Sequence, residues 1–191
     1  MSIDPSKFHP VNVADTCAVW NALSSKVLYA AANDAGCVFC VTSFVEYELM
    51  VKPRKSIKPS EQELINRLIE AKRRGNFETH SCTITDLLSI SNLESRKSLG
   101  KGELSSIAFA MKTHQAFISD DRKATALARD CGHSLSQTTP HLFAWLVFTD
   151  RLGNSDKSTV ISQHNTMERP LAPHFERAYE MALHCKLMAS Q

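Results

Sequence analysis

The sequence predicts an α/β protein in which a parallel sheet lies between two layers of helices. Three observations support this fold class. Short apolar segments with strand character alternate with helical segments across residues 11 to 136. The segment CVFCV at 37–41 is an unbroken apolar run, typical of a strand that is covered on both faces. The 191 residues are enough to bury one core but too few for two equal domains.

The first part of the chain contains two strand–helix units. VNVADT at 11–16 is predicted to be a strand, and the alanine- and leucine-rich segment 18–33 is predicted to be one helix. CVFCV forms the second strand, and the helix at 43–51 follows it until Pro53, which cannot continue a helix.

A basic, proline-containing loop at 52–60 leads into the next helix. Ser60 and Glu63 have the spacing of a capping box, so we expect a helix at 61–74 that ends at Gly75. This helix has one apolar face and would pack on the sheet.

The remaining elements of the α/β part follow from the same periodicities. A strand is predicted at 77–84 and a helix at 85–96, ending before the break LGKG. A helix at 102–114, a short strand at 116–119 and a helix at 121–130 complete the pattern.

After Gln137 the pattern changes, which predicts an α/β domain over 1–137 and a helical C-terminal extension over 138–191. Thr139 is expected to cap, and Pro140 to begin, a helix that runs to residue 152. Because this helix is apolar nearly all round, it must be buried against the core or a partner.

A polar linker at 154–166 is expected to join this helix to a final one at about 171–188. The final helix carries an apolar stripe that we expect to dock on the core, with a surface for a homodimer or an inhibitor as the alternative. The stripe consists of Leu171, Phe175, Ala178, Tyr179, Ala182 and Leu183.

The charge and hydropathy of the sequence limit where the protein can reside and what it can bind. The net charge of +2 does not indicate a nucleic-acid binder, so any such function must come from where the charges are placed. The N-terminus lacks the apolar segment of a secretory signal, and no run approaches the ~18 apolar residues of a membrane span. We therefore expect a cytosolic protein that does not cross a membrane.

Without a secretory signal, the six cysteines are expected to be reduced and mostly buried. Cys37 and Cys40 have the spacing of a zinc site, but residues i and i+3 of a strand point to opposite faces. This geometry argues against zinc.

Acidic residues stand where predicted strands end and helices begin. In open α/β sheets, ligands bind beyond the carboxyl ends of the parallel strands, so these acids should face one cleft. Asp15 ends the first strand, and Glu48 lies in the helix after the second. Glu103 opens the helix after LGKG, and Asp120 and Asp121 follow the strand at 116–119.

Clustered carboxylates repel one another unless they take up protons or bind a cation. Oxygen ligands suit Mg2+ or Mn2+, and such ions can activate an attacking water and stabilise the leaving oxygen of a phosphodiester. Thr16 and Asn21 could supply supporting hydrogen bonds to Asp15 or to a bound water.

Each acid also has a structural interpretation. Acids at helix starts accept backbone N–H groups, which would account for Glu103 and for one of Asp120 and Asp121. Ser43 and Glu46 have capping-box spacing, so Glu48 is preferred to Glu46 as the functional acid. The choice between Asp120 and Asp121 stays open.

The ordered set of acids resembles that of the PIN-domain ribonucleases. The matching segments occur in the family's order and together cover residues 11 to about 136. They are VADTCAVWNALSS at 13–25, VTSFVEYEL at 41–49, LGKGELSSIAFAMK at 99–112 and FISDDRKATALA at 117–128. The helix after residue 60 and the extension from 137 make this chain longer than a minimal member.

The resemblance implies an endoribonuclease that depends on Mg2+ or Mn2+, often the toxin of a toxin–antitoxin pair. Its metal ligands and catalytic residues would be Asp15, Glu48, Glu103, Asp120 and Asp121, with Asn21 as a polar support. The alternative is a non-catalytic PIN-like module that binds RNA or a protein.

Basic residues offer a path for an RNA substrate, because phosphate contacts give affinity without reading sequence. Lys101, Arg122 and Lys123 lie beside the acids and are the predicted substrate-binding residues. Further basic residues are Lys52, Arg54, Lys55, Lys58, Lys72, Arg73 and Arg74, for which ordinary solvated charge is the alternative.

Overall fold

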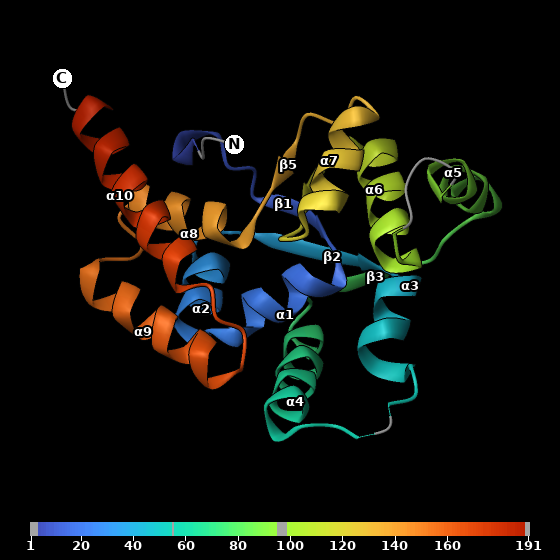
Figure 1. The fold of residues 1–191 in the computed structure, drawn as a ribbon, viewed down its shortest axis with the longest axis horizontal. Helices are drawn as coiled ribbons and strands as arrows, with labels where there is room; N and C mark the ends of the chain where they lie inside the picture. Colours follow the sequence, from blue (N-terminus) through green and yellow to red (C-terminus); the bar gives the residue numbers. More distant parts are fainter. Residues whose placement is uncertain (1–3, 55, 95–98, 190–191) are drawn as a thin grey trace.

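The computed structural model describes residues 4–54, 56–94 and 99–189. Within this part of the chain, parallel strands form one sheet with the order β3-β2-β1-β4-β5. The strands are β1 (Val11–Ala14), β2 (Val38–Thr42), β3 (Glu78–His80), β4 (Ala116–Ile118) and β5 (Ser136–Gln137). The predicted α/β/α sandwich with a central parallel sheet is confirmed (Figure 1).

The strand order reverses at β1, which pairs with β2 on one side and with β4 on the other. The chain runs outward from β1 to β3 and then returns to β4 and β5. Ala14 pairs with Ile118, so the residues that follow these two strands emerge side by side. Such a reversal opens a crevice at the carboxyl ends of the strands, where α/β proteins bind ligands.

Each face of the sheet is covered by its own apolar cluster. One face packs on α1 (Thr16–Ser24), α2 (Lys26–Asp34), α4 (Pro59–Arg73) and the helices that follow β5. The other packs on α5 (Ile84–Glu94), α6 (Lys101–Thr113) and α7 (Arg122–Asp130). Residues 95 and 96, predicted to end the helix at 85–96, lie outside the described residues.

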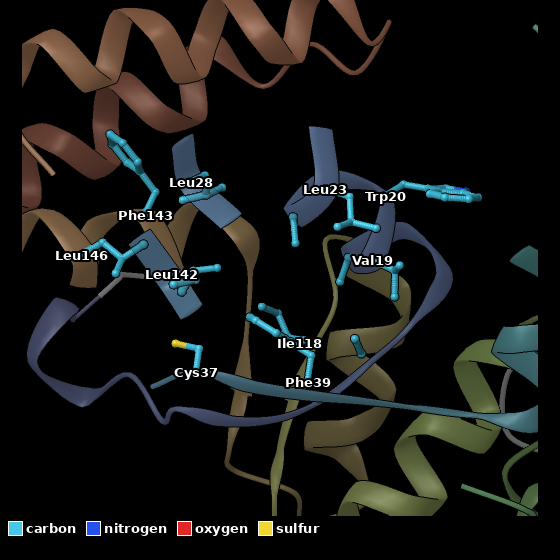
Figure 2. Packing of buried hydrophobic residues seen from close by; sticks show 14 of the residues in the cluster. Val19, Trp20, Leu23, Leu28, Cys37, Phe39, Ile118, Leu142, Phe143 and Leu146 are labelled. Atoms are coloured by element: carbon cyan, nitrogen blue, oxygen red, sulfur yellow. The ribbon is translucent and has the colours of Figure 1, made fainter. Parts of the chain in front are cut away.

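The larger cluster joins the sheet to the C-terminal helices. Figure 2 shows Phe39 of β2 and Ile118 of β4 pointing from the sheet toward Val19 of α1 and Leu142 of α8 (Thr139–Phe148). All four side chains are at most 1% exposed. The helices after β5 therefore share one core with the sheet, although the predicted boundary at Gln137 does coincide with the end of β5.

The predicted polar linker at 154–166 is wrong, because this segment forms α9 (Asn154–Thr166). At the N-cap of this helix, the Gly153 N–H donates a hydrogen bond to Asp156 Oδ2 at 2.8 Å. Only Val160 and His164 are buried on this helix, one turn apart. So few apolar positions give no amphipathic signal, which is why the sequence did not predict the helix.

The final helix α10 (Ala172–Ala189) packs against α8, as predicted for a docked helix. Phe175, Ala178 and Ala182 are fully buried, and the Phe175 ring meets Phe143 edge-on at 5.2 Å between centroids. Leu183 is the exception to the predicted stripe, since it is 41% exposed. Helices α9 and α10 lie at the opposite end of the molecule from α5 (Figure 1).

Two further helix predictions are also wrong, one about continuity and one about a cap. The predicted helix at 18–33 is interrupted at Ser25, whose hydroxyl accepts from the Leu28 N–H at 3.1 Å and caps α2. The capping box at Ser60 is absent, because α4 begins at Pro59 and the Ser60 hydroxyl donates to Glu168 at 3.3 Å. At Ser25 a local hydrogen bond, rather than the apolar pattern, decides where α2 begins. Ser60 instead bonds to a residue that is distant in the sequence and does not cap α4.

All six cysteines are free thiols. Cys37 belongs to the cluster on the α1 face and Cys40 packs against the cluster on the α6 face, as the strand geometry predicted. Among the described residues, no helix is both long enough and apolar enough to cross a membrane.

Phe175→Ala should lower the free energy of unfolding by about 3 kcal/mol, because it leaves a cavity between α10 and α8. Leu187→Ala is the matched control on the same helix, where the side chain is 68% exposed. Urea unfolding followed by circular dichroism measures both. Equal effects of the two substitutions would contradict the docking of α10 on the core.

Candidate functional site

The five predicted acids lie at the carboxyl-end edge of the sheet, on four separate segments. Asp15 directly follows β1, and Asp120 and Asp121 follow β4 at the point where the strand order reverses. Glu48 lies in the turn Tyr47–Val51 (η2) and Glu103 in the first turn of α6. The structure thus brings segments from residues 15 to 121 to one edge of the sheet.

Asp15 is fully buried and held at both carboxylate oxygens. Oδ1 accepts from the Ala18 N–H at 2.8 Å, so Asp15 caps α1. Oδ2 accepts from the Ser119 hydroxyl at 2.5 Å. Burial raises the pKa of Asp15 to about 7, and the negative charges of Asp120 and Glu103 add to this rise. Hydrogen bonds therefore fix the position of the carboxylate, but they do not fully offset the cost of burying its negative charge.

Glu48 is presented by an unusual backbone. The predicted helix at 43–51 is α3 (Ser43–Glu46) followed by the π-helical turn η2. Arg54 closes this turn, since its Nη2 donates to the carbonyls of Glu48 at 2.9 Å and Leu49 at 3.0 Å. The Arg54 guanidinium in turn pairs with Glu61 of α4 at 3.3 Å. Wide turns of this kind recur at functional sites because they re-aim one side chain.

The Glu48 carboxylate is directed toward the starts of α1 and α6. Its Oε2 accepts from the Thr16 hydroxyl at 2.5 Å and its Oε1 from the Gly102 N–H at 3.2 Å. A Cβ atom on residue 102 would lie 2.6 Å from Glu48 Oε2, so any other residue there would displace the Glu48 carboxylate from this position. Thr16 thus contacts Glu48, although Asp15 or a bound water was its predicted partner.

Glu103 is half-buried and lies near Glu48. A Cβ atom placed on Gly100 would be 2.5 Å from Glu103 Oε2 and 3.8 Å from Glu48 Oε1, so the two carboxylates converge above this glycine. Burial raises the pKa of Glu103, and the charges of Glu48 and Asp121 raise it further. Its place at the start of α6 offsets the helix dipole, yet the neighbouring acids outweigh that benefit.

Asp120 and Asp121, which the sequence left undecided, have different partners. Asp121 caps α7 by accepting from the Lys123 N–H at 2.6 Å and the Ala124 N–H at 3.4 Å. Asp120 accepts from Asn21 Nδ2 at 2.7 Å and from both the N–H and the hydroxyl of Thr139. Asp121 therefore has a local structural role, whereas Asp120 is held by distant segments beside Asp15.

Glu46 has a partner away from this edge. The predicted capping box with Ser43 is wrong, because Thr42 caps α3 and Glu46 pairs with Lys72 of α4. That pair borders a hollow of about 580 Å³ between the turn and α4, which none of the five acids lines. The preference for Glu48 over Glu46 thus has a different physical reason from the one predicted.

The basic residues divide into two groups. Arg54, Lys58, Lys72 and Arg74 form ion pairs with Glu61, Glu168, Glu46 and Glu70, respectively. Arg122 and Lys123 are exposed in the first turn of α7, and Lys101 is exposed at the start of α6. Lys55 lies outside the described residues. Lys101, Arg122 and Lys123, the predicted substrate-binding residues, are thus all exposed to solvent.

The donor set fits a hard divalent cation, since all the candidate ligands are carboxylate oxygens and two of them have raised pKa values. In the part of the chain that the structure describes, no three His, Cys, Asp or Glu side chains form a complete ion site as placed. Hydrogen bonds from protein groups hold Asp15, Glu48 and Asp120 instead. The carboxylate side chains would have to rearrange to gather their oxygens around an ion.

Three residues that shape the site were not predicted as part of it: Gly102, Ser119 and Thr139. Arg54 was predicted only as a basic residue on a path for RNA, and its contact with the backbone of Glu48 was not foreseen. Ser119 stands between a strand and two acids, which is the one signal that could have identified it. Thr139 was predicted to cap α8, but Thr138 does so by accepting from the His141 N–H at 3.2 Å. No family model and no curated protein matches the chain, so the resemblance to PIN-domain ribonucleases depends on the residues themselves.

The free energy of unfolding should fall as the pH rises from about 4 to 7. The reason is that the folded-state pKa of Asp15, about 7, exceeds the ordinary value of 3.8, so the folded chain holds the extra proton across this window. At about 1.4 kcal/mol for each pKa unit, the loss amounts to a few kcal/mol.

Asp15→Asn should remove this dependence and stabilise the metal-free chain at pH 8 by about 2 kcal/mol, because the amide keeps the shape without the buried charge. Urea titrations at pH 5 and pH 8 measure the difference. A substituted chain that still loses as much stability as the wild type between these values would show that Asp15 is not the titrating group.

Proposed function

We propose that this chain is an endoribonuclease that depends on Mg2+ or Mn2+ and hydrolyses RNA phosphodiester bonds in the manner of the PIN-domain family. One observation carries the proposal: carboxylates from four segments gather where the strand order reverses, and Asp15 among them is fully buried with a pKa of about 7. A fold that only needed stability would gain nothing from this burial. A site that binds a cation would gain from this burial, because the positive charge stabilises the ionised carboxylates.

Asp15, Glu48, Glu103 and Asp120 are the residues that would hold the ion. When bound, a divalent ion supplies a Lewis acid for the phosphate and lowers the pKa of an attacking water. The protein's part is orientation. Ser119 and the Ala18 N–H fix Asp15, and Thr16 with the Gly102 N–H fixes Glu48.

Substrate contacts come from the exposed cations beside the acids. Arg122 and Lys123 extend from the first turn of α7, next to the cap Asp121, and Lys101 begins α6. Such side chains neutralise phosphates without reading bases, so they supply affinity and register rather than sequence preference.

The proposal includes a toxin role with an antitoxin partner, which the resemblance implies. It also includes self-association, which the apolar stripe of the last helix suggests, and a cytosolic location, which the lack of a signal-like segment suggests. No helix of the described residues could cross a membrane.

Wild-type protein should cleave a fluorophore-labelled single-stranded RNA with Mn2+ and lose that activity in EDTA. Asp15→Asn and Glu48→Gln should each lower the cleavage rate at least ~100-fold, because each removes a charged ligand of the ion. Glu46→Gln is the matched control, since Glu46 pairs with Lys72 away from the other acids. Metal-independent cleavage would contradict the proposal, and no cleavage by the wild type would favour the binding module.

Asp120→Asn and Asp121→Asn should separate the two adjacent acids. Asparagine caps helices as well as aspartate does, so Asp121→Asn keeps the start of α7 and should lower the rate by about 3- to 10-fold. Asp120→Asn should lower it at least ~100-fold, because it removes the charge that lies beside Asp15. The same RNA assay, with melting temperatures as the folding control, measures both. The opposite ranking would make Asp121 the ligand.

A further inference from the structure

Thr139 is the first residue of α8, and its contacts are not those of a helix cap. The residue is fully buried. Its N–H donates to Asp120 Oδ1 at 2.9 Å and its hydroxyl donates to Asp120 Oδ2 at 2.6 Å. The cap of α8 is the preceding residue, Thr138. The Thr139 hydroxyl is therefore not needed to begin the helix and is available to Asp120.

The Asp120 carboxylate is thereby held from two directions. Asn21 of α1 donates to Oδ2 at 2.7 Å, opposite the two donors on Thr139. A carboxylate offers four lone-pair positions, and these three hydrogen bonds use two on Oδ2 and one on Oδ1. The carboxylate also lies at the N-terminal end of α8, where the helix dipole favours a negative charge. Asp120 is thus oriented, with acceptor capacity left on Oδ1.

Helix α8 that carries Thr139 is itself fixed in place. The His141 ring contacts the Asp4 carbonyl at 2.8 Å, and Trp145 stacks on Phe8 with 5.1 Å between ring centroids. On its other side α8 packs against α10. The position of Thr139 therefore depends on how α8 packs against the N-terminal segment and α10.

We propose that Thr139 is a positioning residue that orients Asp120 for a divalent ion, which makes the C-terminal extension a working part of the site. The proposal rests on the proposed function, because it assigns Asp120 to the ion. It differs from a purely structural role in what it predicts. A structural Thr139 would affect folding alone, whereas a positioning Thr139 affects the affinity for the ion in a chain that stays folded.

The test compares Thr139→Ser with Thr139→Ala in the full chain, because these variants differ only in the hydroxyl. Mn2+ binding is measured by electron paramagnetic resonance of the free ion, without RNA, and melting temperature reports folding. The Ala variant should bind Mn2+ about 10-fold more weakly than the Ser variant, which should stay within about 3-fold of the wild type. Thr138→Ala, which removes the cap of α8, should lower the melting temperature but leave Mn2+ affinity within about 2-fold.

Equal Mn2+ affinity in the Ser and Ala variants would overturn the role of Thr139, as would a loss that merely follows the melting temperature across all three variants. Thr139→Val, which keeps the methyl group without the hydroxyl, gives the same comparison if the Ala variant does not fold. A wild-type chain that binds no Mn2+ would overturn the proposed function itself. The two failures are therefore distinguishable.

Discussion

The burial of the Asp15 carboxylate where the strand order reverses is the constraint on which the rest of the site depends. A charge in this position costs free energy, and the fold offsets part of that cost with hydrogen bonds from Ser119 and the Ala18 N–H. Ala14 pairs with Ile118, so the strand register places Asp15 next to Ser119. The charges of Asp120 and Glu103 raise this cost further, and the proposed cation would offset it.

The site is assembled from segments that are far apart in the sequence, and Asp15, Glu48 and Asp120 each depend on a donor from another element. Thr16 of α1 binds Glu48, Asn21 of α1 binds Asp120, and Ser119 after β4 binds Asp15. Helix α1 is therefore the common support, holding one acid on either side of the acid that caps it. This arrangement keeps like charges close together without relying on ion pairs for each of them.

The fold could be predicted from the sequence because its signals are local. Unbroken apolar strands such as 37–41, and the glycine and proline breaks between elements, indicate a parallel sheet without any tertiary information. The supporting contacts of the site could not be predicted, because they join residues such as Asp120 and Thr139 across different elements. Helix α9 was not predicted for another reason: it has too few buried positions to give the sequence a helical pattern of apolar residues. The acids themselves were identified by their order along the chain.

Arg54 closes the π-helical turn, so the basic loop has a structural role in addition to its charge. Arg54 links the carbonyls of Glu48 and Leu49 to Glu61 on α4, so the loop is anchored at both ends to elements of the fold. These contacts restrict the conformation of the loop. A change that moved the Arg54 guanidinium would be transmitted to the backbone of Glu48, so the conformation of this loop is coupled to the geometry of the candidate site.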